Sequence, residues 1–326
     1  MTRQITYSEA LNEALREEMI RDPAVYVVGE DVGGIGGLFD VTRGLLDEFG
    51  AGRIIDTPIS EAAIAGAGIG GALVGARPVI EFQFVDFMTI AMDQIVNHAA
   101  KLRYMTGGGV KIPLVMRSPI CTGISMGAQH SQSLESWFAH VPGLVVIMPS
   151  TPFAAKGLLK AAIRDDNPIV FLESRRLYSV KGEVPEMEFL IKIGKAAVHR
   201  KGSDVTIVAT GRMVPLSVRI AEDVSDTADI EVIDPQTLKP LDTQTILDSV
   251  RKTGKLVIVS EACRSCGFPA EVAATVAELA HDDLKAPIQR VTSHDAPMPV
   301  SEPLESAILP SDQDVIDAIQ RVMAKG

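Results

Sequence analysis

Short apolar runs alternate with amphipathic stretches along almost the whole sequence. The runs are rich in Val and Ile, and the stretches between them repeat apolar residues at helical spacing. The first helix begins at Thr6, where Glu9 completes a capping box, and Asp22-Pro23 ends it. This alternation favours an α/β fold with a largely parallel sheet. The runs expected as strands are 25–28, 79–84, 113–117, 144–148, 169–173, 205–209, 230–233, 256–260 and 288–291, and the main later helices are expected at 42–49, 89–102, 152–164, 268–280 and 312–323.

The chain is long enough for two domains. At about 150 residues per domain, its 326 residues predict two. The alternation weakens after residue 181, where Gly, Pro and charged residues mix with little periodicity, and a second β/α series begins at Asp204. We therefore expect a first domain over 1–185, a linker over 186–200 and a second domain over 201–326.

The charge balance narrows the class of protein. Lys and Arg total 31 against 42 Asp and Glu, giving a net charge of −11. Nucleic-acid and anionic-membrane binders depend on basic surfaces, so neither class is expected. The first 14 residues are polar and lack the apolar segment of a signal peptide. With only three cysteines, the sequence is typical of a protein of the reducing cytoplasm.

Glu61 stands at the expected start of a helix. Ser60 precedes it at an N-cap or first-turn position, where the helix dipole stabilises a carboxylate. Glutamate is common there for purely local reasons, and the alternative is a carboxylate held rigidly towards a cofactor. The stretch 62–76 contains five glycines, each costing about 1 kcal/mol relative to Ala inside a helix. Close packing must compensate, either within the domain or at a subunit interface.

Two further segments combine polar and aromatic residues in unusual ways. His130 is preceded by small residues and flanked by Gln and Ser, which predicts a polar loop leading into a helix. Its intrinsic pKa suits proton transfer near neutrality, although most histidines have no such role. The segment 81–87 holds three of the chain's ten phenylalanines, together with Gln83. Phe87 and its neighbours form either ordinary core packing or a face that stacks on a heterocycle.

Several familiar motifs are incomplete. The glycines from Gly33 to Gly37 lack the spacing of a dinucleotide fingerprint. Cys263 and Cys266 form a Cys-x-x-Cys, but the chain has no second pair for a structural zinc, and we expect a loop. No Gly-x-Ser-x-Gly elbow occurs, which argues against an α/β-hydrolase.

Taken together, these segments resemble the beta subunits of thiamine diphosphate-dependent 2-oxo acid dehydrogenases, over nearly the whole chain. The matching stretches are 29–32 (GEDV), 53–61 (RIIDTPISE), 93–95 (DQI), 101–104 (KLRY), 128–132 (AQHSQ), 142–144 (PGL), 155–158 (AKGL) and 166–168 (DNP). Within that family, the stretches 84–88 (FVDFM), 103–105 (RYM), 177–179 (LYS) and 182–185 (GEVP) are most similar to acetoin dehydrogenase beta subunits.

The resemblance implies a pyrimidine-binding domain followed by a transketolase-type C-terminal α/β domain, in an α2β2 heterotetramer. It implies that thiamine diphosphate lies between two chains, with the aminopyrimidine held by this subunit. The alpha subunit would hold the diphosphate and Mg²⁺ through a Gly-Asp-Gly motif. This sequence contains no Gly-Asp-Gly, so the chain alone is not expected to complete the site.

Site residues follow from the resemblance, position by position. Glu61 matches the glutamate that bonds the pyrimidine nitrogen N1′, and Phe87 matches the aromatic residue packed against that ring. Gln83 matches a neighbouring contact. Glu30 matches an acidic residue in a tunnel between the two cofactors, and His130 matches the histidine that assists acyl transfer to lipoamide. Backbone oxygens of Leu114, Ala162, Asp165 and Asn167 match a structural potassium site.

The favoured activity is a dehydrogenase that forms the hydroxyethyl-thiamine carbanion from acetoin and passes the acyl unit to lipoamide on a separate acyltransferase component. A pyruvate or branched-chain 2-oxo acid dehydrogenase is the alternative, because both routes share that carbanion. A split transketolase subunit and a non-catalytic scaffold that docks the acyltransferase are the remaining readings.

Overall fold

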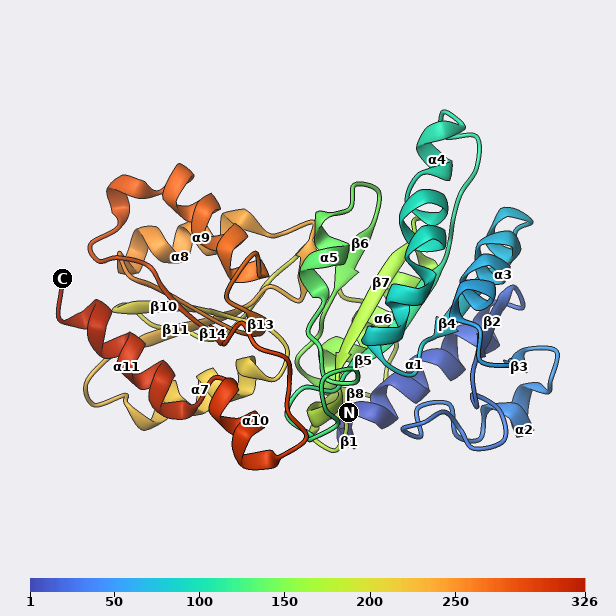
Figure 1. The fold of residues 1–326 in the computed structure, drawn as a ribbon, viewed down its shortest axis with the longest axis horizontal. Helices are drawn as coiled ribbons and strands as arrows, with labels where there is room; N and C mark the ends of the chain where they lie inside the picture. Colours follow the sequence, from blue (N-terminus) through green and yellow to red (C-terminus); the bar gives the residue numbers. More distant parts are fainter. Residues whose placement is uncertain (326) are drawn as a thin grey trace. The chain divides into compact units, whose positions relative to one another are not determined.

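The computed structural model describes residues 1–325 and divides the chain into two compact units (Figure 1). Unit 1 comprises residues 1–120 and 137–193, and unit 2 comprises residues 121–136 and the chain from 194 onward. The segment 121–136, which lies inside the expected first domain, packs with unit 2. The expected linker is divided, because residues 186–193 belong to unit 1 and β9 (Ala197–Arg200) belongs to unit 2.

Unit 1 is built on a parallel sheet with the order β6-β7-β5-β4-β2-β3. Parallel neighbours need a crossover connection, and the amphipathic stretches between the apolar runs supply it. A separate antiparallel pair, β1 with β8, joins the two ends of the unit. The strands are β1 (Thr2–Thr6), β2 (Val25–Gly29), β3 (Ile54–Asp56), β4 (Arg77–Glu81), β5 (Val115–Ile120), β6 (Val145–Ile147), β7 (Ile169–Ser174) and β8 (Lys181–Pro185).

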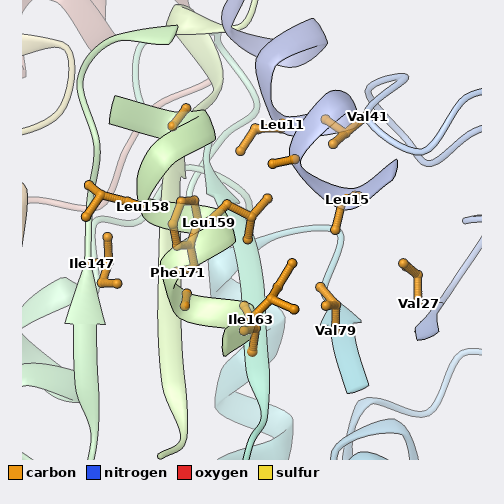
Figure 2. Close-up of a cluster of buried hydrophobic side chains, with 14 of the residues drawn as sticks. Leu11, Leu15, Val27, Val41, Val79, Ile147, Leu158, Leu159, Ile163 and Phe171 are labelled. Atoms are coloured by element: carbon orange, nitrogen blue, oxygen red, sulfur yellow. The ribbon is translucent and has the colours of Figure 1, made fainter. Parts of the chain in front are cut away.

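Two long helices cover one face of this sheet. Apolar residues of α1 (Tyr7–Arg21) and α6 (Pro152–Arg164) point inward, and Figure 2 shows Leu15 above the strand residue Val79 and Ile163 beside it. The capping box of Thr6 and Glu9 is present, as the sequence predicted. Each helix begins after a threonine N-cap whose side chain accepts a backbone hydrogen bond. The capping residues and the buried apolar face therefore favour the same helix boundaries. The other helices of this region are α2 (Leu45–Phe49), α3 (Glu61–Leu73), α4 (Leu102–Met105) and α5 (Glu135–His140).

The predicted continuous helix at 89–102 is wrong. The chain forms a 3₁₀ helix at Val85–Ala91 and a π-helix at Gln94–Ala99, and α4 follows. The N–H of Ala100 donates to the carbonyl of Ile95 at 3.1 Å, an i→i+5 bond that widens the turn. Such segments are frequent at functional sites, and this one follows the candidate residues Gln83 and Phe87.

The glycines of α3 divide into two sets. A methyl group at Gly68 would lie 2.4 Å from Cδ1 of Ile80, and one at Gly71 would lie 2.4 Å from the hydroxyl of Tyr26. These two glycines let the helix approach its own sheet. Gly70 faces open space, so its small size is not required by packing within unit 1.

Unit 2 is a second α/β unit with the sheet order β14-β13-β10-β11-β9, in which only β9 is antiparallel to its neighbour. Helices α7 and α11 contribute the apolar core on one face, and α8 and α9 lie on the other (Figure 1). The remaining elements are β10 (Val205–Ala209), β11 (Ile230–Asp234), β12 (Thr237–Lys239), β13 (Leu256–Cys263), β14 (Gln289–Ser293), α7 (Met213–Asp223), α8 (Thr243–Thr253), α9 (Phe268–Leu279), α10 (Glu302–Ile308) and α11 (Asp312–Met323). Across residues 1–325, no helix is long and apolar enough to cross a membrane.

Candidate cofactor site

The candidate cofactor residues follow strands that end at one edge of the unit 1 sheet. Gly29, the last residue of β2, pairs with Asp56 at the end of β3 and with Glu81 at the end of β4. Glu30 comes directly after Gly29, and Glu61 follows β3 by one short loop. The carboxyl edge of a parallel sheet is where α/β proteins bind ligands.

Glu61 is the first residue of α3 and is only 5% exposed. Its N-cap, Ser60, makes no side-chain capping bond, so the first turn keeps unsatisfied N–H groups and a positive dipole end. No hydrogen bond or ion pair joins the Glu61 carboxylate to another residue within 1–325. The hydroxyl of nearby Thr57 is also buried without a partner. The site therefore presents buried polar atoms that a ligand can satisfy.

Glu30 shares this environment with Glu61. It is 6% exposed, and burial raises the pKa of its carboxyl, with the charges of Glu61 and Asp31 raising it further. This repulsion between the Glu30 and Glu61 carboxylates shows that the structure places these two predicted site residues near each other. A raised pKa makes the protonated form of the carboxyl easier to populate, and this form can donate as well as accept, which suits proton transfer.

Gln83 and Phe87 lie on the chain that leaves β4. The amide Nε2 of Gln83 donates to Oδ2 of Asp31 at 3.3 Å, which ties this chain to the segment after β2. Phe87 is half-buried, with its ring edge-on to Phe84 at 5.4 Å between centroids. The sequence did not single out Asp31, although its φ of 59° is a strained value for a residue other than Gly.

The glycine loop after β2 is fixed by the neighbouring strand. The N–H of Gly33 donates to Oδ1 of Asp56 at 2.7 Å, and the N–H of Gly37 donates to the carbonyl of Asp31 at 2.9 Å. A methyl group at Gly37, whose φ is 79°, would lie 2.7 Å from Oε1 of Glu81. Glycine here permits a close approach to the strand ends, and it shapes the loop that carries Glu30 and Asp31.

A buried charge cluster lies at the same edge and was missed by the sequence analysis. Arg117 of β5 donates from Nε and Nη2 to both carboxylate oxygens of Glu173, at 2.9 and 2.7 Å, and also pairs with Glu81. Tyr178 donates its hydroxyl to Glu173. Although burial opposes it, the carboxylates of Glu173 and Glu81 hold the pKa of Arg117 above its usual value. We call these four residues the Arg117 cluster.

His130 belongs to unit 2, on the segment 121–136. Its N–H closes a turn with the carbonyl of Gly127 at 3.2 Å, and α5 begins five residues later, so the predicted loop before a helix is present. The carboxylate of Glu305 in α10 accepts hydrogen bonds from the N–H groups of Gly123 and Ser125, at 2.9 and 2.8 Å. The loop that leads into the His130 turn is therefore anchored within unit 2.

The four candidate potassium carbonyls lie in unit 1, and three of them already accept hydrogen bonds. The carbonyl of Leu114 accepts from the N–H of Ile169 at 2.8 Å, and that of Ala162 accepts from the N–H of Asp165 at 3.2 Å. Nη2 of Arg77 donates to the carbonyl of Asp165 at 2.6 Å. The side-chain oxygen of Asn167 also accepts from Arg103, so two guanidinium groups already bond to this loop.

The comparisons with known proteins first define a class. Residues 3–181 match the family "Transketolase, pyrimidine binding domain", and residues 194–315 match "Transketolase, C-terminal domain". A solved structure titled "Split gene transketolase, inactive beta4 tetramer" is similar with a TM-score of 0.81 and 22% identity, over 98% of this chain and 99% of that chain. The protein therefore has the transketolase-type two-domain α/β fold, as the sequence predicted.

Curated relatives narrow that class. The pyruvate dehydrogenase E1 component subunit beta of Rickettsia conorii (strain ATCC VR-613 / Malish 7) is 47% identical, covering 98% of each chain. The 2-oxoisovalerate dehydrogenase subunit beta of Bacillus subtilis (strain 168) is 43% identical over 98% of this chain and 99% of its own. The acetoin:2,6-dichlorophenolindophenol oxidoreductase subunit beta of Cupriavidus necator is 43% identical over 100% of this chain and 99% of its own. The chain belongs to the family of beta subunits of thiamine diphosphate-dependent 2-oxo acid dehydrogenases.

Proposed function

We propose that this chain is the beta subunit of an enzyme that oxidatively decarboxylates a 2-oxo acid, with pyruvate as the first candidate substrate and a branched-chain 2-oxo acid as the next. The observation that carries the proposal is the buried Glu61 carboxylate at the start of α3, which no residue within 1–325 satisfies. A buried carboxylate without a partner is costly, and such groups concentrate at functional sites.

The residues present fit the pyrimidine end of thiamine diphosphate. Glu61 offers an acceptor for a ring nitrogen, and Phe87 offers an aromatic face that is half-buried. Bound thiamine diphosphate supplies a nucleophilic carbon that adds to a carbonyl group. Glu61 would hold a proton at N1′, and Gln83 would orient the ring from the segment that it shares with Asp31. Glu30, with its raised pKa, would hold or pass a proton beside Glu61.

His130 would act at the later step. We propose that it assists transfer of the acyl group to a lipoyl group, from a turn that follows the loop held by Glu305. When the acyl unit bonds to one sulfur of the lipoyl disulfide, the S–S bond breaks and the other sulfur leaves as a thiolate. A protonated imidazole would give that thiolate its proton near neutral pH.

The proposal includes an alpha subunit and an acyltransferase. The relatives are named as beta subunits of larger assemblies, and this sequence contains no Gly-Asp-Gly. We infer that an alpha subunit holds the diphosphate and Mg²⁺ in an α2β2 heterotetramer, and that a lipoyl-bearing acyltransferase takes the product. The three free cysteines are in keeping with the cytoplasmic location that we propose.

We also propose a potassium site in unit 1. The carbonyls of Leu114, Ala162, Asp165 and Asn167 would bind it, in competition with Arg77 at the carbonyl of Asp165. Replacing K⁺ by Na⁺ at constant ionic strength tests this part. A lower melting temperature of the assembled enzyme in Na⁺ supports the site, and equal melting temperatures argue against it.

Acetoin, the substrate that the sequence analysis favoured, is the second candidate. The relative from Cupriavidus necator, an acetoin oxidoreductase subunit, is aligned over the whole chain. Pyruvate dehydrogenase subunits are the more frequent kind among the relatives compared, and one reaches 47% identity. A 2-oxo acid is therefore better supported than acetoin as the substrate.

A direct comparison of substrates tests the proposal. The chain would be co-purified with its alpha partner and supplied with thiamine diphosphate and Mg²⁺, and dye reduction would be measured with pyruvate, 3-methyl-2-oxobutanoate and acetoin. We expect the highest kcat/KM with pyruvate and no reduction without thiamine diphosphate. A preference for acetoin would change the proposed substrate to acetoin but leave the proposed cofactor unchanged. Cofactor-independent reduction, or none with any substrate, would overturn the proposed reaction.

A further inference from the structure

Unit 2 contains a cavity of about 450 Å³ beyond the carboxyl ends of β13 and β14. One wall comes from the chain after these strands and includes Cys263, Ser265 and Asp295. The opposite wall is part of the segment 121–136. The volume is that of a small-molecule site, and the carboxyl edge of an open α/β sheet is the usual place for one.

The lining of this cavity selects against anions. It combines the carboxyl groups of Glu261 and Asp295 with apolar side chains such as Met298, and none of the described residues that line it is Lys, Arg or His. Arg212 lies behind the lining and is paired with Glu261 at 2.5 Å. No positively charged side chain among the described lining residues therefore faces an occupant of the cavity. Phosphates and carboxylates, which need basic partners, are excluded by this chemistry.

Three observations indicate that the cavity suits hydrogen-bonding and positively charged groups. Ser131 lines it, is fully buried, and has a hydroxyl without a hydrogen-bond partner. Asp295 accepts from the N–H and hydroxyl of Ser265, at 3.0 and 2.6 Å, and so is held in place. Burial raises the pKa of the Cys263 thiol, and the nearby charges of Asp295 and Glu135 raise it further.

We propose that this cavity binds a small molecule that joins an apolar body to an ammonium or other hydrogen-bond-donating group. The donor would meet Asp295 and the hydroxyl of Ser131, and the body would pack on Leu134 and Met298. This ligand would be additional to the cofactor and substrate proposed above. Its contacts with Ala128 and Ser131 would fall on both sides of His130 in the chain.

The two exposed cysteines allow a matched test on the full chain. Cys263 lines the cavity, whereas Cys266, three residues further on, does not. In Cys266→Ser and Cys263→Ser proteins, each thiol would be modified separately with 2-aminoethyl and 2-sulfonatoethyl methanethiosulfonate. We expect the rate ratio of the cationic to the anionic reagent to be about tenfold higher at Cys263, because about 1.4 kcal/mol of charge interaction gives tenfold. Asp295→Asn should remove most of that difference. Equal ratios at the two thiols would overturn the proposal.

Small probes then test binding itself. Benzylamine and benzoate share one ring and differ in charge, and each would be tested for slowing the reaction of Cys263 with iodoacetamide. We expect benzylamine to protect Cys263 at a concentration at least about fivefold lower than benzoate does, without protecting Cys266. Ser131→Ala should weaken this protection by about threefold to tenfold, the loss of one hydrogen bond. Equal protection by benzoate, or protection by neither compound, would show that the cavity is not such a site.

Discussion

Two groups of buried carboxyl groups lie at the same edge of the unit 1 sheet, and their surroundings differ. In the Arg117 cluster, Glu81 and Glu173 flank one guanidinium, and a tyrosine hydroxyl adds a further bond to Glu173. Glu30 and Glu61 have no cation among residues 1–325, and Glu61 raises the pKa of Glu30. The first group is complete within the chain. The second has no cation among residues 1–325, and this contrast supports the structural role of the first group and the cofactor-binding role that we propose for the second.

The largest effect is expected from Arg117→Met. It would leave Glu81 and Glu173 buried without their cation, and breaking a buried pair in this way costs about 3–5 kcal/mol. Urea unfolding of the isolated chain measures the loss. The control is Arg43→Met, because Arg43 and its partner Asp40 are both exposed and should contribute less than about 1 kcal/mol. Similar losses in the two variants would remove the distinction between the Arg117 cluster and an ordinary surface pair.

Glu61→Gln should show the opposite behaviour. It removes the acceptor proposed for N1′, and we expect kcat to fall at least about 100-fold, or about 2.7 kcal/mol of transition-state stabilisation. The free energy of unfolding should not fall, because no partner within 1–325 loses a bond. Dye reduction by the assembled enzyme and urea unfolding of the chain would be measured on the same preparation. Turnover at the wild-type rate would remove Glu61 from the mechanism.

Tyr178→Phe tests the structural role that we give to the Arg117 cluster. The ring remains stacked on Tyr7 at 5.9 Å, so the change removes only the hydroxyl that bonds to Glu173. A hydrogen bond to a charged group contributes about 1.5–3 kcal/mol, and we expect a loss of stability within this range. Turnover at saturating cofactor should be unchanged. A fall in turnover without a fall in stability would place the cluster in the reaction.

The smallest expected effect is a pH dependence from Glu30. Its pKa is raised in the folded chain, mainly by burial and then by Glu61. Between the ordinary pKa and the raised one, the folded state binds more protons than the unfolded state, so stability falls as the pH rises through this window. Glu30→Gln should therefore be more stable than the wild type at neutral pH, with the difference vanishing towards pH 4. Melting temperatures across this range measure it, and a constant difference would contradict the cause that we give.

The sequence predicted the regular parts of this fold from local signals. The helix at 152–164 and the strand at 205–209 follow from caps and apolar runs and have the predicted bounds, and the strand predicted at 25–28 extends one residue further. The helix at 89–102 was wrong because an i→i+5 bond at Ala100 leaves no mark on apolar spacing. Local patterns report local structure, and the π segment depends on the packing around it.

The site residues also divide into those that local sequence signals indicate and those that depend on packing between distant segments. Glu61 was a candidate because it stands at an expected helix start, whereas the role expected of Glu30 came only from the family resemblance. The Arg117 cluster joins three strands that are far apart in the sequence, so no local pattern reveals it. A charged residue inside an apolar run, as Arg117 is in β5, was the available signal. A buried arginine needs carboxylates from neighbouring strands, and this rule could have been applied to Glu81 and Glu173.

The central claim is that the Glu61 carboxylate meets N1′ of the cofactor, and a two-by-two comparison tests it most directly. The wild type and Glu61→Gln, each assembled with the alpha partner, would be titrated calorimetrically with thiamine diphosphate and with an analogue that carries carbon in place of N1′. We predict that the analogue weakens binding to the wild type but changes binding to Glu61→Gln little, because the variant has already lost the same contact. Equal losses in both proteins would show that Glu61 and N1′ act independently, and would contradict the account.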